Sequence, residues 1–519
     1  MLRVSFPHVP RSNALERSLY TYPEDSMARM STRRCLTLTL LGLILAITVP
    51  AYAQNFTVLH AFTGTPDGAE PYQSDLLDVN GTLFGTTGGG GTYGYGTIFK
   101  LNSKGQEKVL YSFTGGTDGF DPSSGLVRDG SGNLYGTTFF GGDISCSIFG
   151  SVGCGVVYKL SATGTFSVLY SFTAGADGAW PQGVVLDSVG NLYGPAFYGG
   201  LSPQCCGVIF KLDTGGNETP LYTFNDGADG GVPNGFLTID SAGNLYGAAT
   251  LGGDLSACSG AGCGVLFKVD SAGHETVRYT FTGGADGAGP NGALLLDARG
   301  NLFGTAFLGG DLNCVISQGS PGCGVVFEVT PTGVEKVLHT FTGADGAGPS
   351  YGLLRDAAGN FFDTTIYGGT ANVGTVFEVN SKGEKVLYSF HGTTDGAYPQ
   401  SGLVRDAKGN LFSNTVFGGD QSCTVATTPG CGTVFKLVAP PQIIGFSPTS
   451  GPVGTAVTIS GVSLSQTTKV RFNGVAASFT VNSDTRLTAT VPTGATTGKI
   501  GVSSPGGTTA SATSFTVTP

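Results

Sequence analysis

The chain is built from short apolar runs, each bounded by glycine, asparagine or aspartate. In one representative stretch four such runs follow one another: "EKVLYSF" (384–390), "GLVRD" (402–406), "NLFSNTVF" (410–417) and "GTVFKL" (432–437). Valine, threonine, phenylalanine and tyrosine are frequent in them, which is typical of β-strands. The sequence "AKGN" between the second and third runs is a tight hairpin signal. The pattern therefore predicts short antiparallel strands.

The same four-strand pattern occurs seven times. An Asp-Gly pair marks each copy at intervals of 50 to 59 residues, and each copy contains a strand of the type "GVVFKL". The marker aspartates are Asp67, Asp118, Asp177, Asp229, Asp286, Asp345 and Asp395. Four short antiparallel strands repeated at this period are typical of the blades of a β-propeller. A solenoid can share the period, but two tight hairpins in every copy favour blades.

The two ends of the repeated region complement each other. The seventh copy runs from "GTVFKL" directly into "VAPPQ" and has no outer strand of its own. The sequence "FTVLHAF" (56–62) precedes the first copy and has the pattern of such a strand. We therefore expect residues 56–62 to pair with 432–437 and to close the ring, which removes exposed sheet edges.

The motifs "GNLYGTT", "CGVVYKL" and "VLYSFT", followed by the Asp-Gly pair, carry a family resemblance. Over about residues 55–437 the chain resembles the GloVer tandem repeat of exported bacterial proteins. The resemblance implies an extracellular repeat protein and no particular chemistry.

The composition changes after the residues "APP" (439–441), which we interpret as a proline linker. Residues 442–519 contain no cysteine and many threonine, valine and serine residues in about seven short runs. The motifs "SPTSGPVGTAVTISG" and "VRFNG" resemble the IPT/TIG immunoglobulin-like domain, and this implies a role in spacing or adhesion. We thus predict an all-β chain: a seven-bladed β-propeller over 54–438, then an immunoglobulin-like β-sandwich of the IPT/TIG type over 442–519.

Residues 1–53 have the pattern of an export signal. Arg29, Arg33 and Arg34 precede an apolar run over 35–49, and the small residues of "AYA" (51–53) follow it. Cleavage is expected after Ala53, and a start at Met27 or Met30 would give a signal of ordinary length. The apolar run is short for a membrane span and no later run replaces it. We therefore expect a secreted or cell-surface protein with no membrane span in the mature chain.

Charge excludes one class of partner. The formal net charge is −10 at pH 7, and only 12% of the residues are charged. Nucleic-acid binding needs a basic surface, so no nucleic-acid partner is expected.

Ten cysteines remain after Cys35 of the signal, and each pair belongs to the loop between the second and third strands of one copy. An even number in an exported chain predicts disulfides. The expected bridges are Cys146–Cys154, Cys205–Cys206, Cys258–Cys263, Cys314–Cys323 and Cys423–Cys431. For the adjacent pair Cys205 and Cys206, a strained bridge and two free thiols are both open. Only Cys258 and Cys263 have a spacing used in zinc sites, and no metal or other cofactor is expected.

We expect any ligand on the face that carries the long loops, because function often lies on loops held by a rigid scaffold. Aromatic residues recur there: Phe120, Trp180 and Tyr398 in the Asp-Gly loops, and Phe140, Tyr198, Tyr367 and Phe417 before Gly-Gly pairs. They could stack on sugar rings or, alternatively, pack between blades. Trp180 is the only tryptophan, and the shortened "QCCG" loop of its own copy suggests open space beside its ring.

The repeated aspartates allow two interpretations, a cap of their own turn or a calcium ligand. They comprise the Asp-Gly markers and the "GGD" residues Asp143, Asp254, Asp311 and Asp420. Asp and Asn side chains commonly cap turns through local backbone amides. The "GGD" spacing is not that of an EF-hand loop.

Catalysis has little support in the sequence. His60, His274, His339 and His391 occupy different contexts, and no acid or nucleophile is expected to stand out from its sister copies. The prediction is an exported non-catalytic recognition, adhesion or cell-surface structural protein. Its partner would be an extracellular polysaccharide or a cell-surface protein. The alternative is an extracellular propeller lyase or hydrolase acting on polysaccharide.

Overall fold

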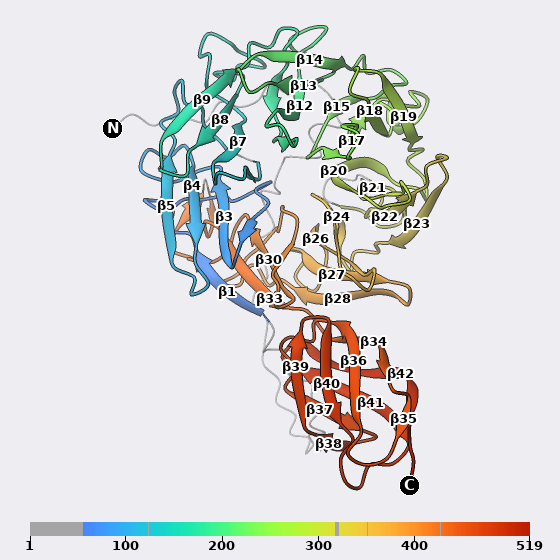
Figure 1. The fold of residues 1–519 in the computed structure, drawn as a ribbon. Helices are drawn as coiled ribbons and strands as arrows, with labels where there is room; N and C mark the ends of the chain where they lie inside the picture. Colours follow the sequence, from blue (N-terminus) through green and yellow to red (C-terminus); the bar gives the residue numbers. More distant parts are fainter. Residues whose placement is uncertain (1–55, 123, 317–320, 350, 426) are drawn as a thin grey trace, which may run out of the picture.

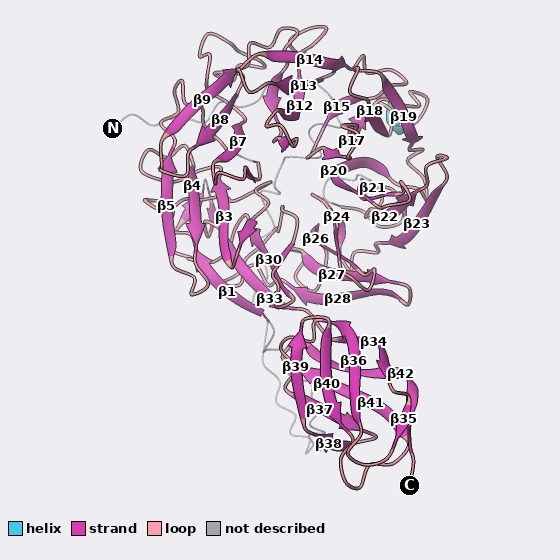
Figure 2. Cartoon of the chain, viewed as in Figure 1, coloured by secondary structure: helices cyan, strands magenta, loops and turns pink. Residues whose placement is uncertain are grey.

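The computed structural model describes residues 56–519, apart from 123, 317–320, 350 and 426. The predicted export signal over residues 1–53 lies outside this range. Within the described residues nearly all regular structure is strand, and the single helical element is the 3-10 turn η1 (Cys258–Gly260) (Figure 2). The predicted all-β class is confirmed.

Each sequence copy forms one antiparallel sheet, and the described residues contain seven such sheets arranged in a ring (Figure 1). We number them in chain order and give their strands from the ring centre outward. Sheet 1 contains β2 (Leu77–Val79), β3 (Thr82–Thr87), β4 (Thr97–Leu101) and β5 (Glu107–Ser112). Sheet 2 contains β6 (Val127–Arg128), β7 (Leu134–Thr138), β8 (Val156–Leu160) and β9 (Phe166–Ser171). Sheet 3 contains β10 (Ala179–Pro181) with β11 (Val185–Leu186), then β12 (Leu192–Tyr198), β13 (Val208–Leu212) and β14 (Glu218–Thr223).

The remaining four sheets repeat this order. Sheet 4 contains β15 (Gly231–Pro233) with β16 (Thr238–Ile239), then β17 (Leu245–Leu251), β18 (Val265–Val269) and β19 (Glu275–Thr280). Sheet 5 contains β20 (Ala288–Leu296), β21 (Leu302–Leu308), β22 (Val325–Val329) and β23 (Glu335–Thr340). Sheet 6 contains β24 (Ala347–Pro349) with β25 (Leu354–Arg355), then β26 (Phe361–Tyr367), β27 (Thr375–Asn380) and β28 (Gly383–Ser389). Sheet 7 contains β29 (Val404–Arg405), β30 (Asn410–Thr415), β33 (Thr433–Val438) and β1 (Phe56–Ala61), and its long loop adds the small hairpin β31 (Thr424–Val425) and β32 (Thr428–Pro429).

The first described strand closes the ring. β1 pairs antiparallel with β33, with Phe56 opposite Leu437 and Ala61 opposite Thr433. It thereby supplies the outer strand that the seventh copy lacks, as the sequence predicts.

A T-shaped aromatic pair holds every junction between neighbouring sheets. One ring follows the outer strand of one sheet, the other lies on the third strand of the next sheet, and the centroids are 5.0 to 5.3 Å apart. The pairs are Phe62–Phe99, Phe113–Tyr158, Phe172–Phe210, Phe224–Phe267, Phe281–Phe327, Phe341–Phe377 and Phe390–Phe435, and all of these side chains are buried. Edge-to-face contacts add about 0.5–1.5 kcal/mol each beyond burial. The same contact therefore fixes each sheet to the next around the whole ring.

The C-terminal region forms two sheets packed face to face. One contains β34 (Gln442–Ser447), β36 (Ala456–Val462), β40 (Arg486–Thr490) and β39 (Phe479–Ser483). The other contains β35 (Ser450–Gly451), β42 (Gly507–Val517), β41 (Gly498–Ser504), β37 (Lys469–Phe472) and β38 (Val475–Ala477). Val457, Ile459, Leu487, Ile500 and Phe515 fill the space between them. Alternating inward residues of this kind are what a β-sandwich requires.

This sandwich rests on the tight turns of sheet 7. Arg405 of β29 forms an ion pair of 2.8 Å with Asp484 and donates a hydrogen bond of 3.0 Å to Ser463. Gln466 donates a hydrogen bond of 2.7 Å to Asn410 at the start of β30. The sandwich therefore covers part of one face of the ring and leaves the opposite face, with the long loops, uncovered. Among the described residues, no helix has the length and apolar character that a membrane crossing needs.

Candidate ligand pocket on the long-loop face

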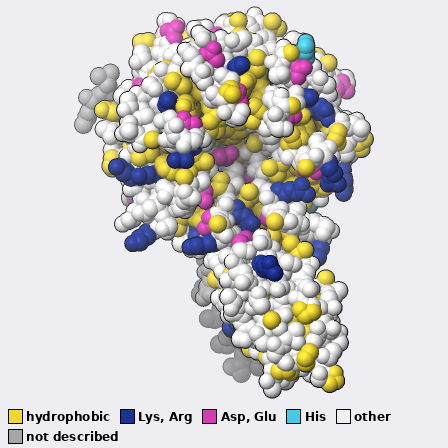
Figure 3. All heavy atoms as spheres, viewed as in Figure 1, with side chains coloured by type: hydrophobic (Ala, Val, Ile, Leu, Met, Phe, Trp, Pro, Cys, Tyr) yellow, Lys and Arg dark blue, Asp and Glu magenta, His cyan; other side chains and the backbone are white. Residues whose placement is uncertain are grey.

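The connections between strands separate onto two faces of the ring. Antiparallel strands send alternate connections to opposite ends, so the tight "Asp-x-x-Gly-Asn" turns all lie on one face. The loops between the second and third strands and the Asp-Gly loops lie on the other, which we call the long-loop face. In Figure 3 hydrophobic side chains gather around the hollowed middle of the ring, while lysine and arginine lie mainly toward its rim.

Disulfides fix five of the long loops. The structure joins each of the predicted pairs, with Cα separations of 5.8, 5.4, 5.6 and 5.7 Å for Cys146–Cys154, Cys258–Cys263, Cys314–Cys323 and Cys423–Cys431. The adjacent residues Cys205 and Cys206 are also bridged. Three of the bridges pack against the glycine that follows the outer strand of the same sheet, as Cys314 does against Gly343. The loop-internal pattern of disulfides is confirmed.

The marker aspartates cap their own loops. Asp118 accepts hydrogen bonds from the Thr114 amide (2.8 Å) and hydroxyl (2.5 Å), and also from the Tyr111 hydroxyl of the outer strand (3.0 Å). The "GGD" aspartates behave similarly, since Asp143 accepts bonds from the Ser145 amide and hydroxyl. Local donors therefore bond these carboxylates, as the turn-capping interpretation states, although the Oδ1 atom of the marker Asp229 has no partner.

One residue of each Asp-Gly loop joins two sheets through its backbone. Its amide donates to the carbonyl that precedes the third strand of the preceding sheet, and its φ lies between 54° and 62°. The residues at this left-handed position are Glu70, Asp121, Trp180, Val232, Gly289, Gly348 and Tyr398. Phe120 is therefore not equivalent to Trp180 and Tyr398, because in its copy Asp121 takes the place.

Trp180 lies in the core rather than on an exposed platform. Only 6% of it is exposed, and its ring contacts Phe139, Phe140, Phe149 and Tyr198 at centroid distances of 5.1 to 6.2 Å. The expectation of open space beside it is wrong, because the covering ring of Phe149 belongs to the long loop of sheet 2 and not to the "QCCG" loop. Tyr198 and Phe417 are likewise buried, at 5% and 4% exposure.

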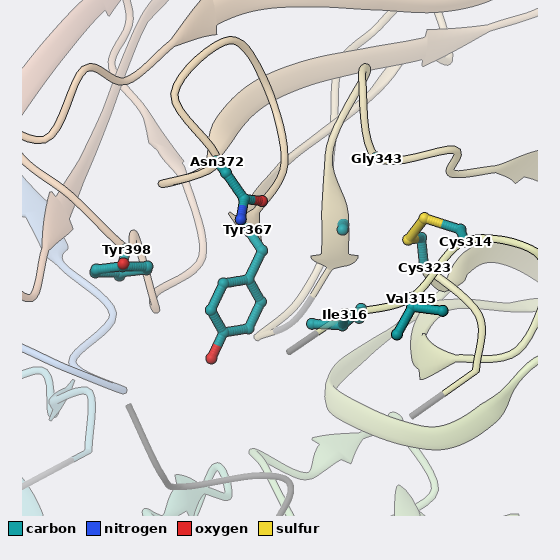
Figure 4. A pocket seen from close by; sticks show the side chains of 9 residues that line it. Cys314, Val315, Ile316, Cys323, Gly343, Tyr367, Asn372 and Tyr398 are labelled. Carbon is teal, nitrogen blue, oxygen red and sulfur yellow. A yellow bond between two sulfur atoms is a disulfide. The ribbon is translucent and has the colours of Figure 1, made fainter. Parts of the chain in front are cut away.

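Two other candidate aromatics line a pocket. It has a volume of about 210 Å³ and lies between the long loop of sheet 5 and the loops of sheets 6 and 7. Its lining residues are Cys314, Val315, Ile316, Cys323, Gly343, Ala347, Tyr367, Asn372 and Tyr398. In Figure 4 Tyr367 stands between Tyr398 on one side and Ile316 and the disulfide on the other.

The pocket combines aromatic faces with polar surface. The rings of Tyr367 and Tyr398 are 5.7 Å apart at an angle of 70°, so they present two differently oriented surfaces. Burial raises the pKa of Tyr398, which keeps its hydroxyl protonated at neutral pH. Asn372 accepts a hydrogen bond of 2.9 Å from the Gly368 amide, which fixes its side chain at the rim. Apolar walls with a few fixed polar groups are typical of small-ligand sites.

Phe120 and Phe140 form a second, smaller aromatic group. Both are partly exposed, their centroids are 5.1 Å apart, and Tyr95 lies 5.6 Å from Phe120. The structure thus divides the seven aromatic candidates. Trp180, Tyr198 and Phe417 are buried, Tyr367 and Tyr398 line the pocket, and Phe120 and Phe140 stack on each other.

The expectation that no acid stands out among the copies is wrong for two residues. Counted back from the buried leucine or valine that follows it, Asp75 occupies a position that is glycine in four other copies (Gly125, Gly183, Gly352 and Gly402), Phe236 in sheet 4 and Ala293 in sheet 5. Asp363 replaces the glycine of "LYG", which is Gly85, Gly136, Gly194, Gly247 and Gly304 in five copies and Ser413 in the other. Aligning the copies column by column would have revealed both from the sequence.

Two groups of metal-ligating side chains occur among the described residues. Cys205 and Cys206 approach Asp226, but both thiols are taken up in the disulfide. His339 approaches Asp345 (2.9 Å) and Glu384, and it occupies an outer-strand position that is tyrosine in five other copies. His60 and His391 also pair with marker aspartates, so three of the four histidines share one context.

A repeat-family model matches most of the chain. It describes a Gloeobacter/Verrucomicrobia repeat and aligns with residues 41–253, 147–317 and 312–519. No curated protein sequence matches the chain.

Solved structures resemble the chain only distantly. A luciferin-regenerating enzyme is 11% identical over 73% of this chain and 94% of that protein, with a TM-score of 0.38. A gluconolactonase from Xanthomonas campestris is 14% identical over 61% and 89%, with a TM-score of 0.34. A fungal alcohol oxidase of the AA5 family is 13% identical over 76% and 96%, with a TM-score of 0.33. Likeness at this level says nothing about activity.

Proposed function

The chain belongs to the Gloeobacter/Verrucomicrobia repeat family, and from this premise we propose an exported, non-catalytic recognition protein. In this proposal the ring is a seven-bladed β-propeller and the C-terminal sandwich is an IPT/TIG domain. The ligand is a saccharide of an extracellular polymer or of a cell-surface glycoprotein, and it binds in the pocket that Tyr367 and Tyr398 line.

The pocket lined by two tyrosine rings is the observation that carries this proposal. Aromatic faces bind the apolar faces of sugar rings, and the Asn372 side chain and the protonated Tyr398 hydroxyl can serve the sugar hydroxyls. The volume of about 210 Å³ suits a single sugar unit rather than a long chain segment. A polymer would therefore be recognised at one residue or at its end.

The surroundings of the pocket support a rigid binding site. The Cys314–Cys323 bridge holds one wall, and Tyr398 is fixed by the bond of its amide to the Val373 carbonyl (2.8 Å). Preorganised walls reduce the entropy lost on binding. The five disulfides fit an oxidising compartment, and the sandwich contacts the opposite face, where it can act as a spacer without covering the pocket.

The test is a glycan array with the mature, oxidised protein, followed by affinity measurements on any hit. Tyr367→Ala and Tyr398→Ala should each weaken binding by roughly tenfold or more, in line with the worth of one aromatic contact. Tyr93→Ala is the matched control, because Tyr93 is a 59% exposed tyrosine on the corresponding loop of sheet 1.

Two outcomes would contradict the proposal. In one, a hit binds both pocket variants as tightly as the wild type. In the other, the protein cleaves the polymer it binds, which would favour the polysaccharide-acting enzyme instead.

A further inference from the structure

Asp75 stands where the inner strands of the ring converge. It precedes β2, at a position that four of the six sister copies give to glycine and the other two to Phe236 and Ala293. Neighbouring copies come close together at this position, since a Cβ on Gly352 would stand 3.2 Å from the Cβ of Ala293. The Asp75 Oδ1 atom accepts a hydrogen bond of 2.6 Å from the Gly402 amide of sheet 7. On its other side Gly125 of sheet 2 approaches so closely that a Cβ there would lie 3.1 Å from the Asp75 Cβ.

Asp363 lies on β26, at a second glycine position of the repeat. The sister copies need glycine because the aromatic ring of the third strand fills the space that a side chain would take. For example, a Cβ on Gly304 would lie 2.8 Å from the Phe327 ring. The Asp363 side chain is fully buried. The amides of Gly352 and Thr364 face it, but neither Oδ atom makes a hydrogen bond of normal geometry.

The two carboxylates are close enough to influence each other. Burial raises the pKa of Asp363 well above its ordinary value, and the charge of Asp75 raises it further. Burial also raises the pKa of Asp75, to about 7, against the opposing effect of the Gly402 amide. Both groups are thus costly to keep ionised without a counter-charge.

A third buried oxygen without a partner belongs to the same chain segment as Asp75. Gln73 is 6% exposed, and its Oε1 atom has no hydrogen-bond partner. Its Nε2 atom donates a bond of 3.3 Å to the Tyr351 hydroxyl. Tyr351 directly precedes Gly352, whose amide faces Asp363. Gln73 of sheet 1 is therefore bonded to the residue next to the glycine whose amide faces Asp363.

No side chain cation balances this group. Among the ion pairs of the described residues, none involves Asp75 or Asp363. Uncompensated carboxylates in a protein interior are strongly disfavoured, and glycine at both positions would avoid the cost, as it does in sheets 2 and 3. Two carboxylates and an amide carbonyl form an all-oxygen donor set, which hard divalent cations such as calcium prefer over softer metals.

We propose that Asp75, Asp363 and Gln73 hold a calcium ion at the centre of the ring, where the ion links sheets 1 and 6. The proposal goes beyond the saccharide pocket, which lies on the long-loop face and shares none of these residues. It also differs from the calcium role considered for the turn aspartates, whose carboxylates accept hydrogen bonds from local amides and hydroxyls.

Calcium titration of the mature protein after EDTA treatment tests the site. At calcium about 100-fold above the Kd, the Tm of the ring should rise by about 5 °C. The double variant Asp75→Gly/Asp363→Gly copies the sister sheets and should show no rise. Its Tm without calcium should equal or exceed that of the EDTA-treated wild type, because the unpaired charges are gone.

Controls separate this site from surface calcium. Asp143→Asn changes an exposed turn aspartate and should leave the calcium response intact. If the double variant fails to fold, Asp363→Asn should still weaken calcium binding about 100-fold in calorimetry, since it keeps the shape and removes one charged ligand. The proposal is overturned if the wild type shows no calcium binding, or if the variants at Asp75 and Asp363 bind calcium as tightly as the wild type.

Discussion

Trp180 and Tyr398 occupy the same place in two copies of the repeat and yet have different surroundings. Both adopt the left-handed conformation, with φ of 57° and 54°, and both donate their amide to the preceding sheet. Trp180 is 6% exposed within an aromatic cluster, whereas Tyr398 lines the pocket. Backbone geometry therefore does not decide whether an aromatic residue at this position packs or remains accessible.

The loop of the preceding sheet makes the difference. Sheet 2 precedes Trp180, and its long stapled loop places Phe149 6.2 Å from the indole ring. Sheet 6 precedes Tyr398, and its loop between the second and third strands is short and has no cysteine. An accessible ring thus requires a short loop in the copy before it.

The largest expected effect is a difference in stability between alanine variants at the two positions. Trp180→Ala should lower the free energy of unfolding of the ring by about 3–5 kcal/mol, because a large buried ring is replaced by a cavity. Tyr398→Ala should cost about 1–2 kcal/mol, because part of that ring is already exposed. Denaturant unfolding followed by circular dichroism measures both, and the left-handed φ affects both alanines alike.

Trp180→Phe serves as the control for this pair. The indole Nε1 group is buried and has no hydrogen-bond partner, so the phenylalanine variant keeps most of the packing and removes an unsatisfied donor. It should lose much less stability than Trp180→Ala. Equal losses for Trp180→Ala and Tyr398→Ala would show that the preceding loop does not control burial.

Much of this arrangement could be predicted from the sequence, and there is a physical reason why the rest could not. The four-strand copies, the pairing of residues 56–62 with 432–437 and the loop-internal cysteine pairs follow from local pattern and count. The environment of Trp180 does not, because the group that covers it comes from another copy. The contacts of a residue in a ring of sheets depend on loop lengths one copy earlier in the sequence.

A different reason explains why the special positions of Asp75 and Asp363 were not predicted. Each lies inside an apparently ordinary strand motif, and only comparison across the copies shows that glycine has been replaced. Their burial depends on how inner strands converge at the ring centre, which no single copy reveals. The pocket at Tyr398 also required the structure, because three sheets contribute to it.

A smaller effect should follow from opening the loop that covers Trp180. In Cys146→Ser/Cys154→Ser the closed loop is short, so the loss of stability should be at most about 2.5 kcal/mol. Because Trp180 is the only tryptophan, its fluorescence reports on this one loop, and its emission should shift to longer wavelength as Phe149 moves away.

Cys314→Ser/Cys323→Ser is the matched control for the staple. It opens a loop of similar length, with sequence separations of 9 and 8 between the paired cysteines. The Cys323 carbonyl of that loop accepts the hydrogen bond of Gly348, so the residue in the left-handed conformation beside this loop is glycine and not an aromatic residue. We expect a similar loss of stability with unchanged tryptophan emission, together with weaker binding at the pocket. A red shift in both variants would mean that the emission reports general loosening rather than the cover of Trp180.

The two junctions also differ at the outer rim. At the junction of sheets 6 and 7, where Tyr398 lies, Phe56 of sheet 7 stacks on Tyr388 of sheet 6 with ring centroids 3.8 Å apart. At the junction of sheets 2 and 3, where Trp180 lies, Glu218 takes the place of Phe56 and stands beside Asp177. The Glu218 Oε1 atom is buried without a hydrogen-bond partner. Burial, followed by the charge of Asp177, raises the pKa of Glu218 to about 7. Five glutamates share this environment and this raised pKa, namely Glu107, Glu218, Glu275, Glu335 and Glu384.

The smallest predicted effect is a change in the pH dependence of stability. A carboxyl whose pKa is higher in the folded state than in the unfolded state contributes stability below its unfolded pKa, near 4.5 for glutamate, and loses that contribution as pH rises through about 7. The Tm of the wild type should therefore fall between pH 5 and pH 8. Glu218→Phe copies the Phe56 junction and should raise the Tm at pH 8 while shrinking the difference between the two pH values by less than one fifth, since Glu70 and Asp75 also have pKa values raised to about 7 beside those of the five glutamates. Glu218→Gln separates the causes, because it removes the charge without adding a ring and should reduce the pH dependence equally with a smaller gain in Tm. A pH profile that neither variant alters would mean that the glutamates at these junctions titrate as they do in the unfolded chain.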